Sequence, residues 1–308
     1  MRRRTPPEEN IPLIVYTPFA WGEPKPPAPP AKQPSVPEGQ KDSPFFDFTA
    51  TGDTYVRFDG CVVGDHRTYR PGTVLLSQAH GVMPKGGHPT QKIFFVNGIA
   101  NSPKDHYDSL SAIANQANAE VVGIYNASEG TAKDFWQCIK DKLGIGYNPA
   151  VTTLRDGLYA ELISGSNQPI NLMAHSQGAL ITSRALGEVR NRLQEAGLSA
   201  TEVNAQMSRI NVETFGGAAY GFPDGPHYNH HVNTADPVSG LFGQGTMLPA
   251  VSPLAAAASA PAMHAGAGAQ THRFTDYKGN EPGASKVHGF TGVYLPHWES
   301  PFPRNASQ

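Results

Sequence analysis

The sequence predicts an α/β protein with a mainly parallel central sheet. Short apolar segments alternate along the chain with segments whose apolar residues recur at helical spacing, and turn residues separate them. Strands of a parallel sheet are buried on both sides and are therefore short apolar runs, and the helices that connect them cover both faces. We therefore expect one central sheet with helices on both faces.

The expected elements follow one another between residues 54 and 298. Two strands are expected ahead of the alternating part, in TYVRFDGCVV (54–63) and TVLLSQA (73–79). The later strands are expected in KIFFVNGI (92–99), EVVGIYNAS (120–128), PINLMAH (169–175), RINVETFGG (209–217), HYNHHVNTADPV (227–238) and THRFTDY (271–277). The helices are expected in PKDHYDSLSAIANQANA (103–119), TAKDFWQCIKDKLG (131–144), PAVTTLRDGLYAELISGS (149–166) and QGALITSRALGEVRNRLQEAG (177–197).

Composition limits the domain count and the class of partner. The chain has 308 residues, enough for one large domain with insertions, and a formal net charge of -2 at pH 7. Its one basic cluster, residues 2–4, is too small to form the basic surface that binds nucleic acid. Proline dominates WGEPKPPAPPAKQPSVPEGQKDSP (21–44) and favours extended backbone. We expect a Pro-rich arm over residues 1–48 and one domain over residues 49–308.

The first residues bear on the export route. The arginines at 2–4 precede the apolar stretch IPLIVYTPFAWG, but TPPEEN places two prolines and two glutamates where the apolar part of a Sec signal begins. We expect no Sec export and a cytoplasmic location in the producing cell. No stretch has the apolar length of a transmembrane helix. Cys61 and Cys138 are compatible with a disulfide or with two thiols, and do not identify the compartment.

Ser176 is the expected nucleophile. It lies in INLMAHSQGALITSRAL (170–186), between an expected strand and an expected helix, and open α/β sheets bind their ligands at the carboxyl ends of strands. A sharp strand-to-helix turn exposes a serine hydroxyl but crowds the positions two residues before and after it, where Ala174 and Gly178 are both small. The alternative is an ordinary helix N-cap, a position at which serine is also favoured.

In this context AHSQG resembles the nucleophile elbow of the α/β-hydrolase superfamily of lipases and esterases, with a resemblance that covers residues 90–300. Ala174 stands where the usual motif has glycine, a departure that some small lipases share. The resemblance implies an α/β-hydrolase fold, a Ser–Asp–His triad and no metal or organic cofactor. It also implies an oxyanion hole built from the backbone N–H of Gln177 and from one in FFVNGIANSP, for which we expect Ile99 and, next, Ala100.

The superfamily order of Ser, then Asp or Glu, then His implies an acid and a base later in the chain. Asp236 in NTADPV is the expected acid, with Asp224 in GFPDGP as the alternative; an Asp before Pro is also a common turn residue. His288 in SKVHGFTGVYLPHW is the expected base, in the loop before a final aromatic helix. His297 is the alternative base, although its place beside Trp298 is typical of a packed residue.

Three clustered histidines raise the question of a metal site. His227, His230 and His231 have no Cys or carboxylate at ligand spacing, and adjacent strand residues point to opposite faces. We expect no metal there.

A long apolar segment, residues 239–270, separates the expected acid from the expected base. It is rich in Ala, Gly and Pro, and structureless insertions of this length are functional or disordered. Two interpretations stay open. A lid-like insertion or acyl-chain contact surface would favour a lipid substrate and contact with a membrane surface; the other interpretation is a disordered loop.

Together these features predict a serine ester hydrolase, a lipase, phospholipase or related esterase, that acts on a lipid or other ester. The alternatives are an acyltransferase on the same scaffold and a non-catalytic hydrolase-like module that binds a protein. The Pro-rich leader, FFVNGI and AHSQG also resemble, more loosely, the lipase-type antibacterial effectors of type VI secretion systems. That resemblance implies phospholipid substrates in a rival cell, a partner in the secretion apparatus and a cognate immunity protein.

Overall fold

The structure is a computed structural model that describes residues 58–70, 72–127, 148–244, 264–277, 285–299 and 302. The chain divides into two compact units, Met1–Asp42 and Ser43–Gln308, and every described residue belongs to the second unit. The predicted Pro-rich arm, residues 1–48, and the helix predicted at 131–144 lie outside the described residues.

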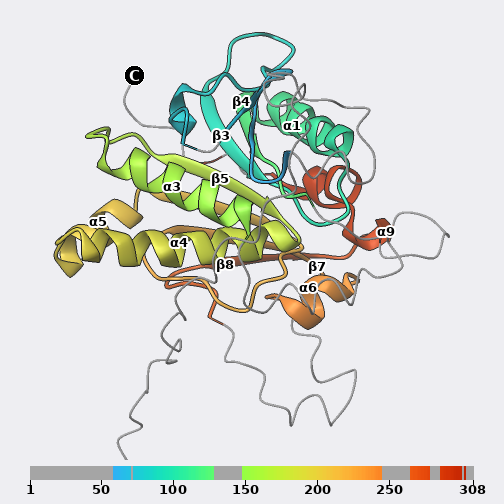
Figure 1. Ribbon diagram of the computed structural model, residues 1–308. Coiled ribbons are helices and arrows are strands. Elements are labelled where there is room, and N and C mark those ends of the chain that lie inside the picture. The colour runs from blue at the N-terminus through green and yellow to red at the C-terminus, as the bar shows by residue number, and fades with distance from the viewer. Residues whose placement is uncertain are drawn as a thin grey trace, which may run out of the picture. The chain divides into compact units, whose positions relative to one another are not determined.

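An eight-stranded sheet forms the centre of the second unit, in the order β2-β1-β4-β3-β5-β6-β7-β8 (Figure 1). The strands from β4 to β8 in this order pair in parallel, whereas β1 pairs antiparallel with both β2 and β4. The predicted α/β class with a mainly parallel sheet is therefore confirmed. The strands are β1 (Val62–Val63), β2 (Thr68–Tyr69), β3 (Gln91–Val96), β4 (Ala119–Ile124), β5 (Ile170–His175), β6 (Ile210–Phe215), β7 (His227–Asn233) and β8 (Gln270–Phe274).

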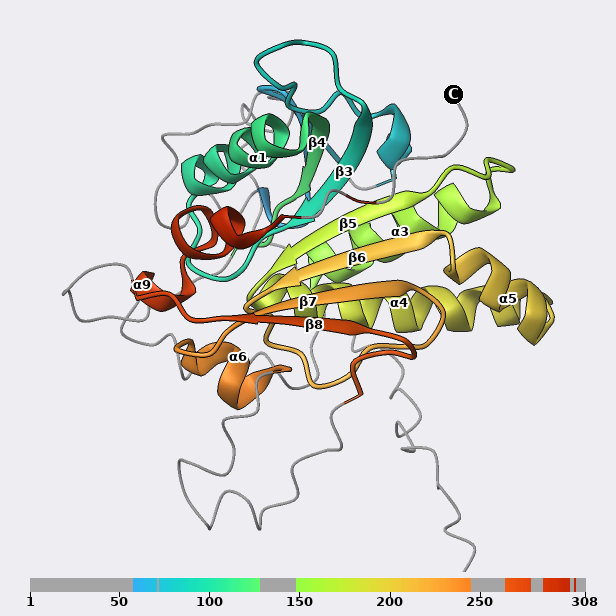
Figure 2. The same ribbon diagram turned by 180° about the vertical axis from the view of Figure 1, so that it is seen from behind.

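Helices cover both faces of the sheet, as predicted. Figure 1 shows α3, α4 and α5 in front of the sheet; Figure 2, turned by 180°, shows the strands in front, with α1 and the C-terminal helical turns on this side. In β5, Leu172 packs into the apolar core with α3 and α4, and the next residue, Met173, packs into the core with α1. The helices are α1 (Pro103–Ala117), α3 (Pro149–Ile163), α4 (Gln177–Glu195), α5 (Ala200–Met207), α6 (Pro237–Phe242) and α9 (Ser285–His288), followed by the π-helix η6 (Phe290–Tyr294) and the 3₁₀ helix η7 (Leu295–His297).

The prediction of a strand at residues 73–79 is wrong. The chain forms the 3₁₀ helix η4 (Leu76–Gln78) there. Leu76 is buried against α3, and the Ser77 N–H donates to Glu161 Oε1 of the same helix at 2.7 Å. These contacts hold the segment beside α3 and away from the sheet, so packing overrides the β propensity of its apolar residues.

In the described part of the strand predicted at 54–63, residues 58–63, only Val62–Val63 form a strand, β1. Residues 54–57 lie outside the described residues, and Gly60 joins the edge of β4 through a hydrogen bond from its N–H to Tyr125 O at 2.8 Å. Three further elements, β2, α5 and α6, have no counterpart among the predictions. The strand predicted at 227–238 ends at Asn233 as β7, and α6 begins at Pro237. A signal for α5 is nevertheless present in the sequence, because Ser199 and Glu202 form a capping box at its start.

The segment predicted to be structureless, residues 239–270, contains regular structure at both ends. The helix α6 extends to Phe242, His264 forms an isolated β-bridge, and β8 begins at Gln270. Residues 245–263 lie outside the described residues. The lid-like interpretation of that part stays a prediction.

The sheet register places the carboxyl ends of the parallel strands at one edge. Ala174 of β5 is level with Val96 of β3 and Thr214 of β6, and Thr214 is level with His230 of β7. The connections after β3, β5, β7 and β8 therefore leave the sheet at the same edge, and these connections carry the residues expected to act together.

Candidate active site

Ser176 lies in the turn from β5 to α4, in a backbone conformation that residues with a side chain seldom adopt. Its φ is 54° and its ψ is -123°, and such a conformation costs about 1–3 kcal/mol. The turn is held from both sides, because the Ser176 N–H donates to Phe215 O at 3.0 Å and its carbonyl accepts from Ala179 N at 3.1 Å and Ala218 N at 3.0 Å. The Ser176 hydroxyl makes no cap hydrogen bond to the helix. The interpretation of Ser176 as an ordinary N-cap is therefore wrong.

The turn has no room for larger neighbours. A Cβ added at Gly178 would lie 2.3 Å from Val96 O, a contact that would force the backbone of β3 to move. A Cβ added at Gly98, in the loop after β3, would lie 2.7 Å from Ser176 Cβ and 3.2 Å from its Oγ. Ala174 is fully buried. Of the two small residues predicted on sequence grounds, Gly178 is thus required by its close approach to β3.

Asp236 and His288 form a buried pair at the same edge. His288 Nδ1 donates to Asp236 Oδ2 at 2.6 Å, and the two side chains are 7% and 0% exposed. Asp236 ends the connection after β7 and caps α6, accepting from Val238 N at Oδ1 at 2.8 Å. His288 is the last residue of α9 rather than part of a loop. The structure therefore brings together the acid and the base that the sequence predicted.

The imidazole of His288 lies beside the residue that precedes Ser176. The rings of His175 and His288 have centroids 4.7 Å apart, and His175 Nε2 donates to the His288 carbonyl oxygen at 2.8 Å. Ser176 Oγ is buried and makes no hydrogen bond to any described residue. Ser176 directly follows His175, whose ring lies beside that of His288, and among the described residues no hydrogen bond joins Ser176 Oγ to the imidazole. Catalytic hydrogen bonds are often long or poorly aligned before substrate binds.

Two backbone N–H groups of the expected oxyanion hole lie beside this turn. Gln177 is the first residue of α4, where N–H groups have no partner within the helix. Its side chain is anchored, since Gln177 Oε1 accepts from Asn126 Nδ2 at 2.9 Å. The Ile99 N–H donates to no acceptor within the described part of the chain. Ala100 has a φ of 57°, so the loop turns sharply there.

Asn97 holds this loop against the next strand. Its Oδ1 accepts from Asn126 N at 2.9 Å, and its Nδ2 donates to Gly98 O at 2.8 Å and to Asn126 O at 2.9 Å. The sequence analysis did not single out Asn97. The signal for its role is a polar side chain directly after a buried strand.

Charge states within the site follow from burial. Burial, and next the adjacent His288, lower the pKa of His175 well below its ordinary value of 6.5, so His175 is neutral at physiological pH. Burial, and next the charge of Asp236, raise the pKa of Tyr294, whose hydroxyl donates to Asp236 Oδ2 at 2.5 Å. Tyr294 therefore stays a hydrogen-bond donor. Sequence reasoning missed this contact, which joins residues far apart in the chain.

The alternative acid and base each have a partner elsewhere. Asp224 Oδ1 accepts from His264 Nε2 at 2.8 Å, and both side chains are more than half exposed. His297 Nε2 donates to Asp276 Oδ2 at 3.0 Å. Neither pair is joined by a hydrogen bond to Ser176, Asp236 or His288 among the described residues. The structure therefore does not bring Asp224 or His297 into the arrangement.

The three histidines of β7 are dispersed, as the alternation of strand residues requires. His230 Nε2 donates to Ala265 O at 2.9 Å and its Nδ1 accepts from Thr214 Oγ1 at 2.7 Å. His231 Nε2 donates to Glu213 Oε2 at 2.6 Å, and His227 is exposed. Within the described residues, no group of three or more His, Cys, Asp or Glu is arranged to hold a metal ion.

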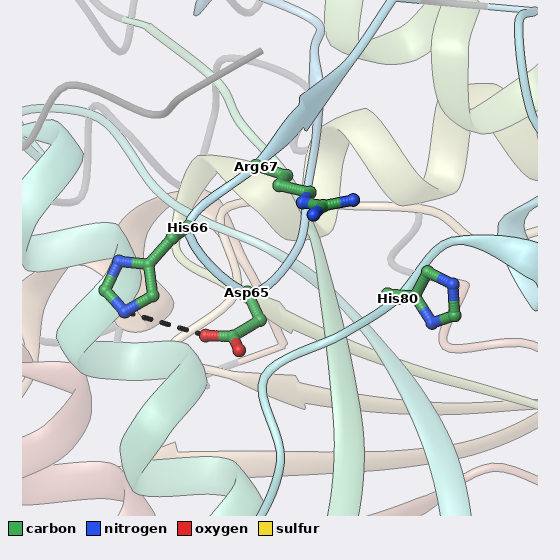
Figure 3. A pocket seen from close by; sticks show the side chains of 4 residues that line it. All are labelled: Asp65, His66, Arg67 and His80. Carbon is green, nitrogen blue, oxygen red and sulfur yellow. Dashed lines mark ion pairs between the residues drawn. The ribbon is translucent and has the colours of Figure 1, made fainter.

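A cavity of about 480 Å³ lies at the antiparallel end of the sheet, away from this arrangement. It is lined by Asp65, His66, Arg67 and His80 (Figure 3). Figure 3 shows His66 and Asp65 turned toward one another, and their ion pair spans 3.7 Å. None of the residues expected to act in catalysis lines this cavity.

Comparisons with known proteins identify no family for this chain. No model of a known protein family matches the chain, and no curated protein matches its sequence. Among the described residues, none of the helices combines the length and apolarity needed to cross a membrane.

Proposed function

We propose that this protein is a serine hydrolase of carboxylic esters with an α/β-hydrolase fold. The observation that carries the proposal is the strained Ser176 at the end of β5 together with the buried Asp236–His288 pair at the same edge of the sheet. The chain order Ser, Asp, His, the strand-to-helix turn at the serine and the glycine-containing loop after β3 are all features of that superfamily. They support the proposal jointly, because each requirement concerns a different part of the chain.

The hydrogen bond to Asp236 defines the role of His288. A carboxylate only accepts, so Nδ1 of His288 carries a hydrogen and the lone pair is on Nε2. In the proposed reaction His288 Nε2 takes the proton of Ser176 Oγ as that oxygen attacks the ester carbonyl. The Asp236 carboxylate holds the ring in this tautomer and stabilises the imidazolium that forms. The burial of the pair strengthens this interaction, since little water screens it.

The developing oxyanion is the second requirement of the reaction. The N–H groups of Gln177 and Ile99, together with the positive end of α4, would stabilise the negative charge of the tetrahedral intermediate. His288 then donates its proton to the leaving alcohol, which leaves an acyl group on Ser176. Water, activated by the same histidine, hydrolyses this ester and restores the free serine.

The proposed substrates are lipid esters, and phospholipids in particular if the chain is an effector of the type VI class. This part of the proposal is supported by the resemblance of FFVNGI and AHSQG, and by the apolar composition of residues 239–270. A panel of esters of increasing acyl length, ending with phospholipid vesicles, tests it. Preference for short soluble esters over every lipid would contradict it, and transfer of the acyl group to an added alcohol would indicate an acyltransferase.

Labelling with a fluorophosphonate probe tests the reaction class directly. The probe should modify Ser176 in the wild-type protein and nothing in Ser176→Ala, and hydrolysis of a soluble ester should fall by at least about 10³-fold in that variant. His288→Ala should lose turnover while His297→Ala keeps it, because only His288 is paired with Asp236. A wild-type protein that neither reacts with the probe nor cleaves any ester would refute the proposal.

A further inference from the structure

The side chain of Asn233 uses its full hydrogen-bonding capacity at the end of β7. Its Nδ2 donates to Asp276 O and to Val287 O, both at 2.9 Å. Its Oδ1 accepts from Ala235 N at 3.2 Å and from Asp276 N at 3.0 Å. A primary amide has two N–H donors and two acceptor lone pairs, so all four are used. Asn233 is 0% exposed, and water therefore cannot replace these bonds.

These four bonds join the chain segments of the acid and of the base. Ala235 directly precedes Asp236, and Val287 directly precedes His288, so one amide is bound next to both members of the pair. The third segment, at Asp276, is the connection that follows β8. Two of the partners, Asp276 and Val287, are 43 and 54 residues away from Asn233 in the chain. Among the described residues no backbone–backbone hydrogen bond joins α9 to β7, and the Asn233 amide is a direct bridge between them.

Tyr294 connects the same network to the acid itself. Its hydroxyl accepts from Asn233 N at 3.2 Å and donates to Asp236 Oδ2 at 2.5 Å, the oxygen that also accepts from His288. Tyr294 is 0% exposed. The Tyr294 ring lies close to Gly216, where an added Cβ would be 2.8 Å from both the ring and the hydroxyl oxygen. This close approach and the φ of 55° both require glycine at position 216. The hydroxyl is thus held in place by packing.

We propose that Asn233 and Tyr294 are positioning residues that hold the Asp236–His288 pair in its reactive geometry, and that the Tyr294 hydroxyl weakens the pull of Asp236 on the His288 proton. The inference rests on the proposed hydrolase function. Two donors share one carboxylate oxygen, so each hydrogen bond takes part of its negative charge. Without the tyrosine hydroxyl, His288 Nδ1 is the remaining side-chain donor to Asp236 Oδ2, and the attraction between this oxygen and a protonated imidazole grows.

In the described part of the chain, titratable side chains from three elements contact His288. Within the described residues, His288 is approached by Asp236 from the start of α6, by His175 from β5 and by Tyr294 from η6. Burial lowers the pKa of His175 and raises that of Tyr294, so both stay neutral through the range in which an esterase is assayed. A change in the acidic limb of the pH–rate profile therefore reports on Asp236 and His288.

The test uses Tyr294→Phe and Asn233→Ala in the full chain, with Tyr228→Phe and Asn171→Ala as matched controls. Tyr228 and Asn171 are also buried, at 3% and 5% exposed, and their side chains also make hydrogen bonds inside the protein, but these bonds involve no residue of the proposed site. In Tyr294→Phe we expect kcat on a soluble ester to fall about tenfold, with KM little changed and the acidic limb of the kcat/KM profile moved to higher pH. In Asn233→Ala we expect a loss of about 10²-fold, since misplacement of the pair affects every step.

A proton spectrum supplies a measurement that needs no activity. The short His288 Nδ1–H···Asp236 Oδ2 bond should give a far-downfield proton signal, assigned by its loss in Asp236→Asn. This signal should broaden or vanish in Asn233→Ala and move further downfield in Tyr294→Phe, while both controls retain it unchanged. If Asn233→Ala does not fold, Tyr294→Phe decides.

The two proposals fail in different ways. A folded wild-type protein without esterase activity would refute the function, and the proton signal would still test the positioning role. Wild-type kcat, pH profile and downfield signal in folded Tyr294→Phe and Asn233→Ala would overturn the positioning role while leaving the hydrolase proposal intact.

Discussion

Replacing Asp236 by Asn changes one oxygen of the side chain to an NH₂ group and tests the proposed mechanism without removing packing. The Asp236 Oδ1 acceptor for Val238 N can be kept by the amide oxygen, so the cap of α6 survives. The NH₂ group then occupies the position of Oδ2, where His288 Nδ1 and the Tyr294 hydroxyl now donate. A donor facing Nδ1 forces the proton of the imidazole onto Nε2, and Nε2 can no longer accept the proton of Ser176.

The expected loss in kcat is about 10⁴-fold, the size seen when a triad histidine is held in the wrong tautomer. At 1.36 kcal/mol for each factor of ten, this corresponds to about 5.4 kcal/mol of transition-state stabilisation. The free energy of unfolding should fall by a smaller amount, about 1–3 kcal/mol, because the buried Tyr294 hydroxyl loses its acceptor. Turnover of a soluble ester and urea unfolding measure the two quantities separately.

Asp224→Asn is the matched control, since it makes the same change in a second, exposed Asp–His pair. Asp224 and His264 are more than half exposed, so the loss of their hydrogen bond should affect neither turnover nor folding appreciably. Near-normal turnover in a folded Asp236→Asn protein would refute the tautomer argument. Loss of turnover in Asp224→Asn instead would show that the acid is assigned to the wrong residue.

Two further predictions concern backbone strain and thiol reactivity. Ser176→Gly should have a free energy of unfolding about 1 kcal/mol higher than Ser176→Ala, because only glycine relieves the strain of a φ of 54°. Urea unfolding of the two variants measures this difference. Equal midpoints with equal slopes would show that the turn is unstrained. Burial, and next the charge of Asp59, raise the pKa of the Cys61 thiol to about 11, so at pH 8 almost no thiolate forms and iodoacetamide should modify Cys61 only in denaturant. Peptide mass spectrometry measures the alkylation of Cys61. Alkylation of Cys61 in the native protein as fast as in urea would contradict this prediction.

The turn at Ser176 was predictable because its requirements are local. An apolar strand, a small residue on each side of the serine and a helix with a regular apolar face are all visible within residues 170–197. The same reasoning fails for residues 73–79, whose composition favours a strand. That segment becomes the 3₁₀ helix η4 because Glu161, far along the chain, accepts from the Ser77 N–H, and no local pattern contains that contact.

The acid and the base were predictable in order but not in geometry. Asp236 and His288 were the expected acid and base, but the order Ser, Asp, His also allows Asp224 and His297. All four residues follow strands or precede a helix in much the same way. The hydrogen bond between His288 Nδ1 and Asp236 Oδ2 joins residues 52 positions apart. Only the sheet, by bringing the ends of β5, β7 and β8 to one edge, distinguishes this pair from the others.

The sequence by itself determined the α/β class, the succession of most strands and helices, and the residue at the sharp turn, because periodicity and the size of neighbouring side chains act over a few residues. Tertiary structure alone decided which carboxylate meets which imidazole, and placed the Asn233 amide and the Tyr294 hydroxyl around them. The physical reason is that a hydrogen bond depends on distance and angle between side chains, and these are defined only when the strands that carry them have paired.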